Sequence, residues 1–143
     1  MSIKYHEIAV DMVAEKLRKT LSTISEVKIA VLFGSALRRE FVRDVDVGVY
    51  LDPSFELKDL VKLANLLEDV LRIPVDVVPL EKAPTKLALK ALLEGVRLVV
   101  KDKKLFWLLV TQALSEAMDM EIKFKELEKA NRTKVDRKIF DYV

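Results

Sequence analysis

The chain has 143 residues, 51% of them hydrophobic and 34% charged, with a formal net charge of +2. This composition is typical of one globular domain. The net charge is too small to indicate nucleic-acid binding by itself. The absence of cysteine excludes disulfides and cysteine-ligated zinc, and the single His6 excludes multi-histidine metal sites. No apolar run approaches the ~20 residues that span a membrane, and no signal peptide is recognisable, so we expect a cytoplasmic protein without membrane contact.

The pattern of apolar residues predicts helices and strands that alternate along the chain. It favours an α/β (α+β) fold with a central mixed sheet of about four strands, flanked by helices. Helices are expected over 3–21, 55–71 and 84–95, with a short one over 35–40. A long C-terminal helix is expected over 103–131. Strands are expected over 27–33, 45–50, 73–78 and 96–100, the last of them at an edge of the sheet.

Two carboxylates mark the start of the second predicted strand, in the run Asp44-Val45-Asp46. Side chains alternate between the faces of a strand, so Asp44 and Asp46 point to the same side, about 6.6 Å apart along the chain. Carboxylates this close repel each other, and a shared cation removes that penalty. Oxygen ligands of this kind suit Mg²⁺ or Mn²⁺.

A third carboxylate, Asp76, stands between valines in the predicted strand 73–78. If this strand neighbours the strand 45–50, Asp76 can complete a cluster with the other two aspartates. Gly34-Ser35 ends the first strand and supplies the opposite wall. The glycine lets a phosphate approach the backbone, and Ser35 can cap the next helix while its hydroxyl meets a phosphate oxygen.

Each signal also has a simpler structural interpretation. Asp44 and Asp46 could be a solvated strand end paired with Arg43 or Arg38, and Asp76 could be a buried ion-pair partner of Arg72 or Lys28. Gly34-Ser35 could be only a turn with a helix cap. The occurrence of all three pieces in order favours a metal and phosphate site, and the absence of GxxxxGK[ST] excludes a P-loop.

Taken together, Gly34-Ser35, Arg38, the Asp44-Val45-Asp46 motif and Asp76 resemble the nucleotidyltransferases of the DNA polymerase β superfamily. More narrowly, nearly the whole chain is similar to the minimal nucleotidyltransferase (MNT) proteins that pair with HEPN-domain toxins. The resemblance implies one minimal nucleotidyltransferase domain over 1–143, with a catalytic core over about 1–100 and a helical extension over 103–139. It also implies a nucleotidyltransferase-like sheet.

The resemblance further implies an antitoxin that moves AMP from ATP to a hydroxyl, expected to be a tyrosine hydroxyl, of a HEPN toxin. Asp44, Asp46 and Asp76 would be catalytic and would bind two Mg²⁺ ions, with Mn²⁺ as a possible substitute. A nucleotide would be bound by Gly34, Ser35 and Arg38. The expected partners are ATP and the toxin, and a homo-oligomer is compatible with the sequence.

Two alternatives stay open. The loop between Gly34-Ser35 and Asp44 is shorter than is usual in that family, and Arg39 stands where glycine is common, which favours a weak or inactive antitoxin that neutralises its partner by binding. A nucleotidyltransferase acting on a small molecule or an RNA end is the other alternative. The chain has little room for the extra domain that a small substrate would need, and no clear basic surface for RNA.

The C-terminal helix predicts a docking surface. A helix over 103–131 would be about 43 Å long, more than a four-stranded sheet can cover. We therefore expect its distal part to project apolar groups that the N-terminal helix covers only in part. These groups are Met118, Met120, Ile122, Phe124 and Leu127.

Overall fold

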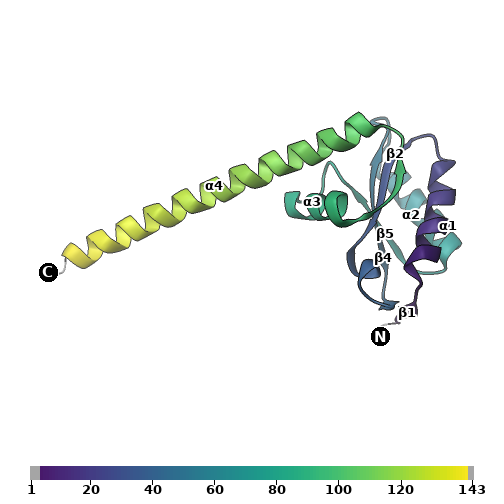
Figure 1. The fold of residues 1–143 in the computed structure, drawn as a ribbon, viewed down its shortest axis with the longest axis horizontal. Helices are drawn as coiled ribbons and strands as arrows, with labels where there is room; N and C mark the ends of the chain where they lie inside the picture. Colours follow the sequence, from purple (N-terminus) through teal and green to yellow (C-terminus); the bar gives the residue numbers. More distant parts are fainter. Residues whose placement is uncertain (1–3, 142–143) are drawn as a thin grey trace.

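A mixed sheet of four strands forms the centre of the computed structural model, which describes residues 4–141, with side chains up to residue 132. The strands are β2 (Val27–Phe33), β4 (Val45–Leu51), β5 (Val75–Pro79) and β6 (Val96–Val100), in the spatial order β5-β4-β2-β6. β2 pairs antiparallel with β4 and with β6, and β4 pairs parallel with β5 (Figure 1). The predicted fold class is confirmed, and β6 lies at an edge as expected.

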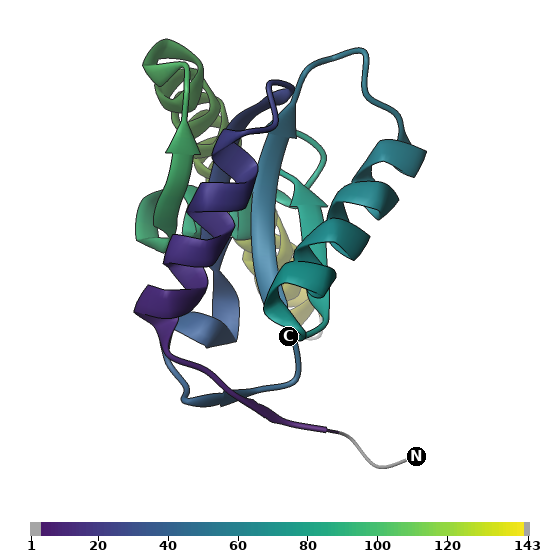
Figure 2. The same ribbon diagram turned by 90° about the vertical axis from the view of Figure 1, so that its right-hand side faces the viewer.

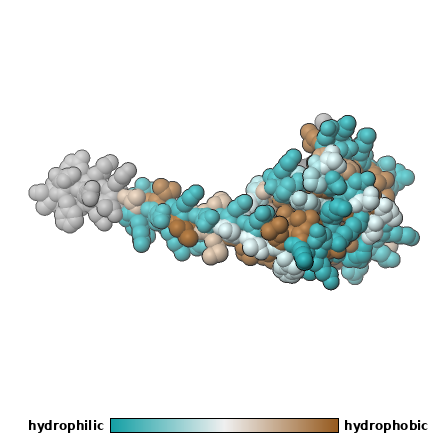
Figure 3. All heavy atoms as spheres, turned by 90° about the horizontal axis from the view of Figure 1, so that it is seen from above, coloured by the Kyte–Doolittle hydropathy of each residue, from teal (hydrophilic) through white to brown (hydrophobic). Residues whose placement is uncertain are grey.

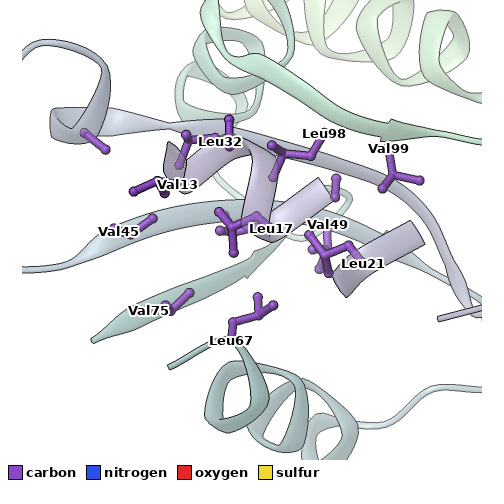
Figure 4. Packing of buried hydrophobic residues seen from close by; sticks show 14 of the residues in the cluster. Val13, Leu17, Leu21, Leu32, Val45, Val49, Leu67, Val75, Leu98 and Val99 are labelled. Atoms are coloured by element: carbon purple, nitrogen blue, oxygen red, sulfur yellow. The ribbon is translucent and has the colours of Figure 1, made fainter. Parts of the chain in front are cut away.

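One face of the sheet is covered by α1 (Val10–Ser22) and α2 (Leu57–Leu71), as Figure 2 shows. Both helices are amphipathic, and α1 turns Leu17 and Leu21 fully into the core. Alternate residues of β4 point to this face, and they pack with Leu67 of α2 and with both α1 leucines (Figure 4). The other residues of β4, including Asp46, therefore face the opposite side.

The opposite face carries a second core built from α3 (Thr85–Glu94) and the first turns of α4 (Lys103–Asp141). Phe106 of α4 is 1% exposed and packs with Val31 and Phe33 of β2. The Arg97 guanidinium lies 4.5 Å from the centre of the Phe106 ring, so a cation–π contact joins β6 to α4. These contacts fix the direction in which α4 leaves the sheet.

Most of α4 projects away from the body of the molecule (Figure 1). Its 39 residues correspond to about 58 Å of helix at 1.5 Å per residue. The predicted end near residue 131 was wrong, because no glycine or proline interrupts 103–141 and the charged residues there favour a helix. The prediction that α1 partly covers α4 was also wrong, since α1 lies on the other face of the sheet and α3 packs against α4 instead.

A two-stranded ribbon near the N-terminus was not predicted. β1 (His6–Glu7) pairs antiparallel with β3 (Phe41–Val42), and the Ile8 N–H donates a hydrogen bond to the Glu40 carbonyl at 2.8 Å. The first helix therefore begins at Val10 rather than at residue 3. The short helix expected over 35–40 is a single 3₁₀ turn, η1 (Gly34–Leu37), because the chain extends again into β3. Among the described residues, no helix is long and apolar enough to cross a membrane.

Candidate metal and nucleotide site

The three predicted carboxylates come together at one end of the sheet. Asp46 of β4 lies directly opposite Asp76 of β5, and Asp44 immediately precedes β4. Asp44, Asp46 and Asp76 each offer a carboxylate oxygen that lies within 4.8 Å of the other two. All three stand on the face of α3 and α4, since the intervening Val45 and Val75 belong to the core on the other face.

Backbone contacts hold the two strand starts in register. The Val45 N–H donates to the Pro74 carbonyl at 2.9 Å. The Val75 N–H donates to the Glu68 carboxylate of α2 at 3.0 Å. Glu68 of α2 therefore holds the start of β5 in place. The three aspartates are positioned by their strands and not by hydrogen bonds to one another.

The negative charges of the three carboxylates repel one another. Burial, together with the neighbouring negative charges of Asp44 and Asp76, raises the pKa of Asp46 to about 6. Burial also raises the pKa of Asp76, followed by repulsion from Asp44 and from Glu68. A carboxylate whose charged form is destabilised by its neighbours gains from any cation placed between them, and this is what a metal site requires.

Gly34 is the residue that permits this packing. It adopts a φ of +83°, in the region that only glycine enters readily, and it follows directly after Phe33, the partner of Asp46 across the β2–β4 pair. A Cβ added to Gly34 would collide with the Asp46 carboxylate oxygen. The backbone of η1 and the carboxylate cluster thus lie in direct contact, with no room for a side chain between them.

Ser35 and Arg38 lie beside the cluster, in a pocket of about 340 Å³ that Asp44 also lines. Ser35 is inside the 3₁₀ turn rather than at a helix cap, and its carbonyl accepts hydrogen bonds at 3.0 Å from the backbone N–H groups of Arg38 and Arg39. The Arg38 guanidinium lies 3.8 Å from the Glu94 carboxylate, with both side chains 63% exposed. Such an exposed pair is weak, so Arg38 can turn to another anion.

The donor set fits a hard divalent cation. The three carboxylates repel one another and lie beside the Gly34 backbone and the Ser35 hydroxyl. This set supplies oxygen ligands only. The structure thus brings together every site residue that the sequence indicated, namely Asp44, Asp46, Asp76, Gly34, Ser35 and Arg38. Their roles in binding and catalysis stay predictions.

The pocket also includes residues that sequence reasoning did not place there. Tyr5 and Phe41 reach it from the β1–β3 ribbon, Arg43 from the loop before β4, and Lys90 from α3. Lys90 reads in the sequence as an ordinary exposed lysine of an amphipathic helix, and only the packing of α3 beside β2 brings it here. The two-residue strands carry no periodicity that could have signalled Tyr5 or Phe41.

Solved structures show the same fold. A chain from a structure of the MntA–HepT toxin–antitoxin is 21% identical, with a TM-score of 0.64, covering 82% of this chain and 94% of that one. A chain from a structure of the tri-AMPylated Shewanella oneidensis HEPN toxin in complex with MNT antitoxin is 22% identical, with a TM-score of 0.65 and coverages of 83% and 95%. A third, from a toxin–antitoxin with AMP-PNP, is 21% identical, with a TM-score of 0.64 and coverages of 84% and 95%. At these identities the likeness concerns the fold.

Sequence comparison defines the family. A comparison with curated proteins finds no match. The family model described as polymerase beta, nucleotidyltransferase matches residues 15–104, which is more than half of the chain. The match runs from within α1 to the start of α4 and includes all three aspartates. The chain therefore belongs to the polymerase beta nucleotidyltransferase family.

Proposed function

We propose that this protein is a metal-dependent nucleotidyltransferase that moves AMP from ATP to a tyrosine hydroxyl of a HEPN-domain toxin, and so acts as an antitoxin. The observation that carries the proposal is the meeting of three carboxylates within 4.8 Å beside the backbone of Gly34. Residues 1–100 would form the catalytic core and 103–139 a helical extension that serves the partner. The activity belongs to the family that the chain matches.

In the proposed reaction, an oxygen–phosphorus bond forms between the acceptor hydroxyl and the α-phosphorus of ATP. The bond from the α-phosphorus to the bridging oxygen of the β-phosphate breaks, and pyrophosphate leaves. Asp44, Asp46 and Asp76 would hold the divalent cations, which when bound would neutralise the phosphates and stabilise the leaving oxygen. Gly34 and Ser35 would hold the phosphate tail against the sheet.

Asp76 is the best placed of the three to receive the proton of the acceptor hydroxyl. It is exposed, whereas Asp44 and Asp46 are half-buried, so an incoming protein side chain can reach it. Burial and the charges of Asp44 and Glu68 raise its pKa, which improves it as a general base near neutral pH. Its position opposite Asp46 keeps it beside the reacting phosphate.

A protein acceptor is supported by the relatives of similar fold. One of those structures holds a tri-AMPylated HEPN toxin in complex with an MNT antitoxin, and another a toxin–antitoxin with AMP-PNP. These proteins differ from this chain at most positions, and their partners and ligands come to it only as part of this proposal. A toxin would bring its own tyrosine to the open side of the cluster, where Asp76 is exposed.

The distal part of α4 is where we propose that the toxin docks. Apolar residues continue along one side of α4 in alternating steps of four and three residues, the spacing with which helices pack side by side. The first of them, Phe106, Val110 and Ala113, are buried in this chain. Further on, Met120, Phe124 and Leu127 are exposed, along a part of the helix that extends from the body in Figure 3.

This distal stripe, defined as Met120, Phe124 and Leu127, lies on a helix of the face that also carries the carboxylates. α4 packs on that face of the sheet through Phe106 and Leu109, and the stripe begins where α3 stops covering the helix. A helical toxin packed along the stripe would bury the exposed continuation of the apolar residues that are buried nearer the start of α4. The rest of the toxin surface would face the side of the cluster on which Asp76 is exposed.

Co-expression with a cognate HEPN toxin tests the proposal. With the wild-type chain, we expect the toxin to gain the mass of one AMP group for each modified tyrosine and the cells to grow. With Asp46→Ala, we expect neither the added mass nor growth, because positioning and electrostatics supply most of the catalysis in such sites. An antitoxin that acts by contact alone would instead protect equally well with Asp46→Ala and leave the toxin mass unchanged.

A further inference from the structure

The pocket beside the carboxylates is strongly cationic. It has a volume of about 340 Å³ and lies between η1, the β1–β3 ribbon and α3. Four cationic side chains line it against a single carboxylate, that of Asp44. The cations are Arg38, Arg39, Arg43 and Lys90. A net positive pocket that shares a wall with an acidic cluster is suited to a ligand that is itself an anion and carries a metal at one end.

The four cations come from separate elements. Arg38 and Arg39 follow the 3₁₀ turn, Arg43 stands between β3 and β4, and Lys90 belongs to α3. Within the part of the chain that the structure describes, Arg39, Arg43 and Lys90 form no ion pair, and Arg38 has only the long exposed contact with Glu94. Apart from that contact, no ion pair between described residues accounts for the convergence of the four cations.

The ribbon completes the pocket on its outer side. His6 pairs with Val42 and Glu7 with Phe41, and Tyr5 and Arg43 each lie one residue beyond the His6–Val42 pair. Tyr5, Phe41 and Arg43 all line the pocket from this end of the ribbon. Val42 is 2% exposed and anchors the ribbon in the core, whereas Tyr5 and Phe41 are 59% and 54% exposed. The ribbon thus holds two aromatic rings and one arginine at the pocket.

We propose that Lys90 is a further phosphate-binding residue of the proposed nucleotide site, in contact with the phosphate tail that Gly34 and Ser35 would hold. The inference deepens the proposed nucleotidyl transfer and rests on it. Lys90 lines the pocket from α3, whereas Arg38 and Arg39 line it from the segment after η1, so cations from two separate elements would contact a phosphate tail bound there. The same contacts would stabilise the pyrophosphate as it leaves, because its charge rises when the bond to the α-phosphorus breaks.

Direct binding measurements with Mg²⁺ in excess test this assignment. We expect Lys90→Gln to weaken the affinity for ATP and for inorganic tripolyphosphate by about tenfold, as for the loss of one charge-assisted hydrogen bond. The affinity for AMP should stay the same, because AMP has no β- or γ-phosphate. Lys86→Gln is the matched control, since Lys86 lies one turn earlier on α3 and lines a different cavity, beside Met120 and Phe124.

The possible outcomes distinguish a failure of the phosphate assignment from a failure of the proposed function. If Lys90→Gln binds ATP and tripolyphosphate like the wild type, the phosphate assignment is overturned even when the wild type transfers AMP. If the wild type binds both ligands and Lys90→Gln loses them, yet no AMP reaches any toxin, the pocket stands and the proposed function fails. If Phe41→Ala weakens AMP binding while tripolyphosphate binding is kept in Lys90→Gln, the pocket holds the base instead.

Discussion

Asp46 and Asp76 stand directly opposite each other on the parallel strands β4 and β5. The pairing explains why two acidic residues lie in strands made otherwise of apolar residues, because each strand places one carboxylate beside the other. Burial raises the pKa of both groups, and nearby negative charges add to it: those of Asp44 and Asp76 on Asp46, and those of Asp44 and Glu68 on Asp76. The cost of keeping these charges together in the free protein is measurable.

That cost predicts the effect of pH on stability. The pKa of Asp46 is about 6 in the folded protein, above its value of 3.8 in a model compound, so the folded state binds this proton more tightly. The destabilisation from Asp46 is therefore absent below about pH 4, grows between pH 4 and 6 and is complete above that. We expect Asp46→Asn to melt a few degrees higher than wild type at pH 7.5 without metal, and equally at pH 4.

Metal should reverse this difference. Addition of Mg²⁺ or Mn²⁺ should raise the melting temperature of the wild type at pH 7.5, and less at pH 5, where a proton competes for Asp46. Asp46→Asn should show little metal-induced stabilisation at either pH. An equal metal-induced shift in the wild type and in Asp46→Asn would mean that the cation binds elsewhere.

Gly34→Ala should damage the site more than the fold. The added Cβ collides with the Asp46 carboxylate, and alanine at a φ of +83° costs about 1–2 kcal/mol. We expect the Mg²⁺-induced thermal shift to be lost and the affinity for ATP to fall at least tenfold, as measured by calorimetry.

Gly48→Ala serves as the matched comparison. Its Cβ would lie 2.7 Å from the Leu80 Cδ2 atom, so it crowds the core and should cost about 1–3 kcal/mol of stability. Because it does not approach a carboxylate oxygen, the Mg²⁺-induced shift should remain. If Gly34→Ala keeps that shift as well, the contact between η1 and Asp46 has no part in metal binding.

Phe124→Glu tests the distal stripe of α4. Phe124 is 61% exposed, so the substitution should leave the melting temperature and ATP binding unchanged. Affinity for a cognate HEPN toxin, measured by surface binding or gel filtration, should fall at least tenfold if the ring is buried in the complex.

The sequence placed Ile122 in the docking surface, but Ile122 is not part of the distal stripe, so Ile122→Glu provides the control for charge alone. Ile122 is 54% exposed on the same helix. It lies two positions before Phe124, which places the two side chains about 200° apart around the helix axis. We expect the toxin to bind this variant as it binds the wild type. Equal loss in both variants would point to a general charge effect rather than to the stripe.

The fold was predictable wherever apolar residues formed long runs. β2, β4, β5 and β6 and all four α-helices were expected, because periodicity and buried runs determine them. The start of α2 was placed two residues early. Ser54 donates backbone and side-chain hydrogen bonds to Asp52, which forms a turn and lowers the pKa of that carboxyl. The helix itself begins after Glu56, whose N–H donates to Asp59.

The acidic half of the site was predictable, together with Gly34 and Ser35, but of the cationic half only Arg38 was indicated, through the family resemblance. Asp44, Asp46 and Asp76 are conspicuous because carboxylates are costly next to buried valines. Arg43 and Lys90 were not predictable, since in the sequence they resemble any solvated side chain. They come together only through the β1–β3 ribbon and the packing of α3 beside β2, which are tertiary contacts without a local signal.

Radiolabelled ATP tests the central claim most directly. The purified protein is incubated with Mg²⁺, a cognate HEPN toxin and ATP labelled either at the α- or at the γ-phosphate, with Asp46→Ala in parallel. Nucleotidyl transfer predicts that the α-label is incorporated into the toxin, that the γ-label is released as pyrophosphate, and that Asp46→Ala incorporates neither. Incorporation of the γ-label, or of the α-label with Asp46→Ala at the wild-type rate, would contradict the account.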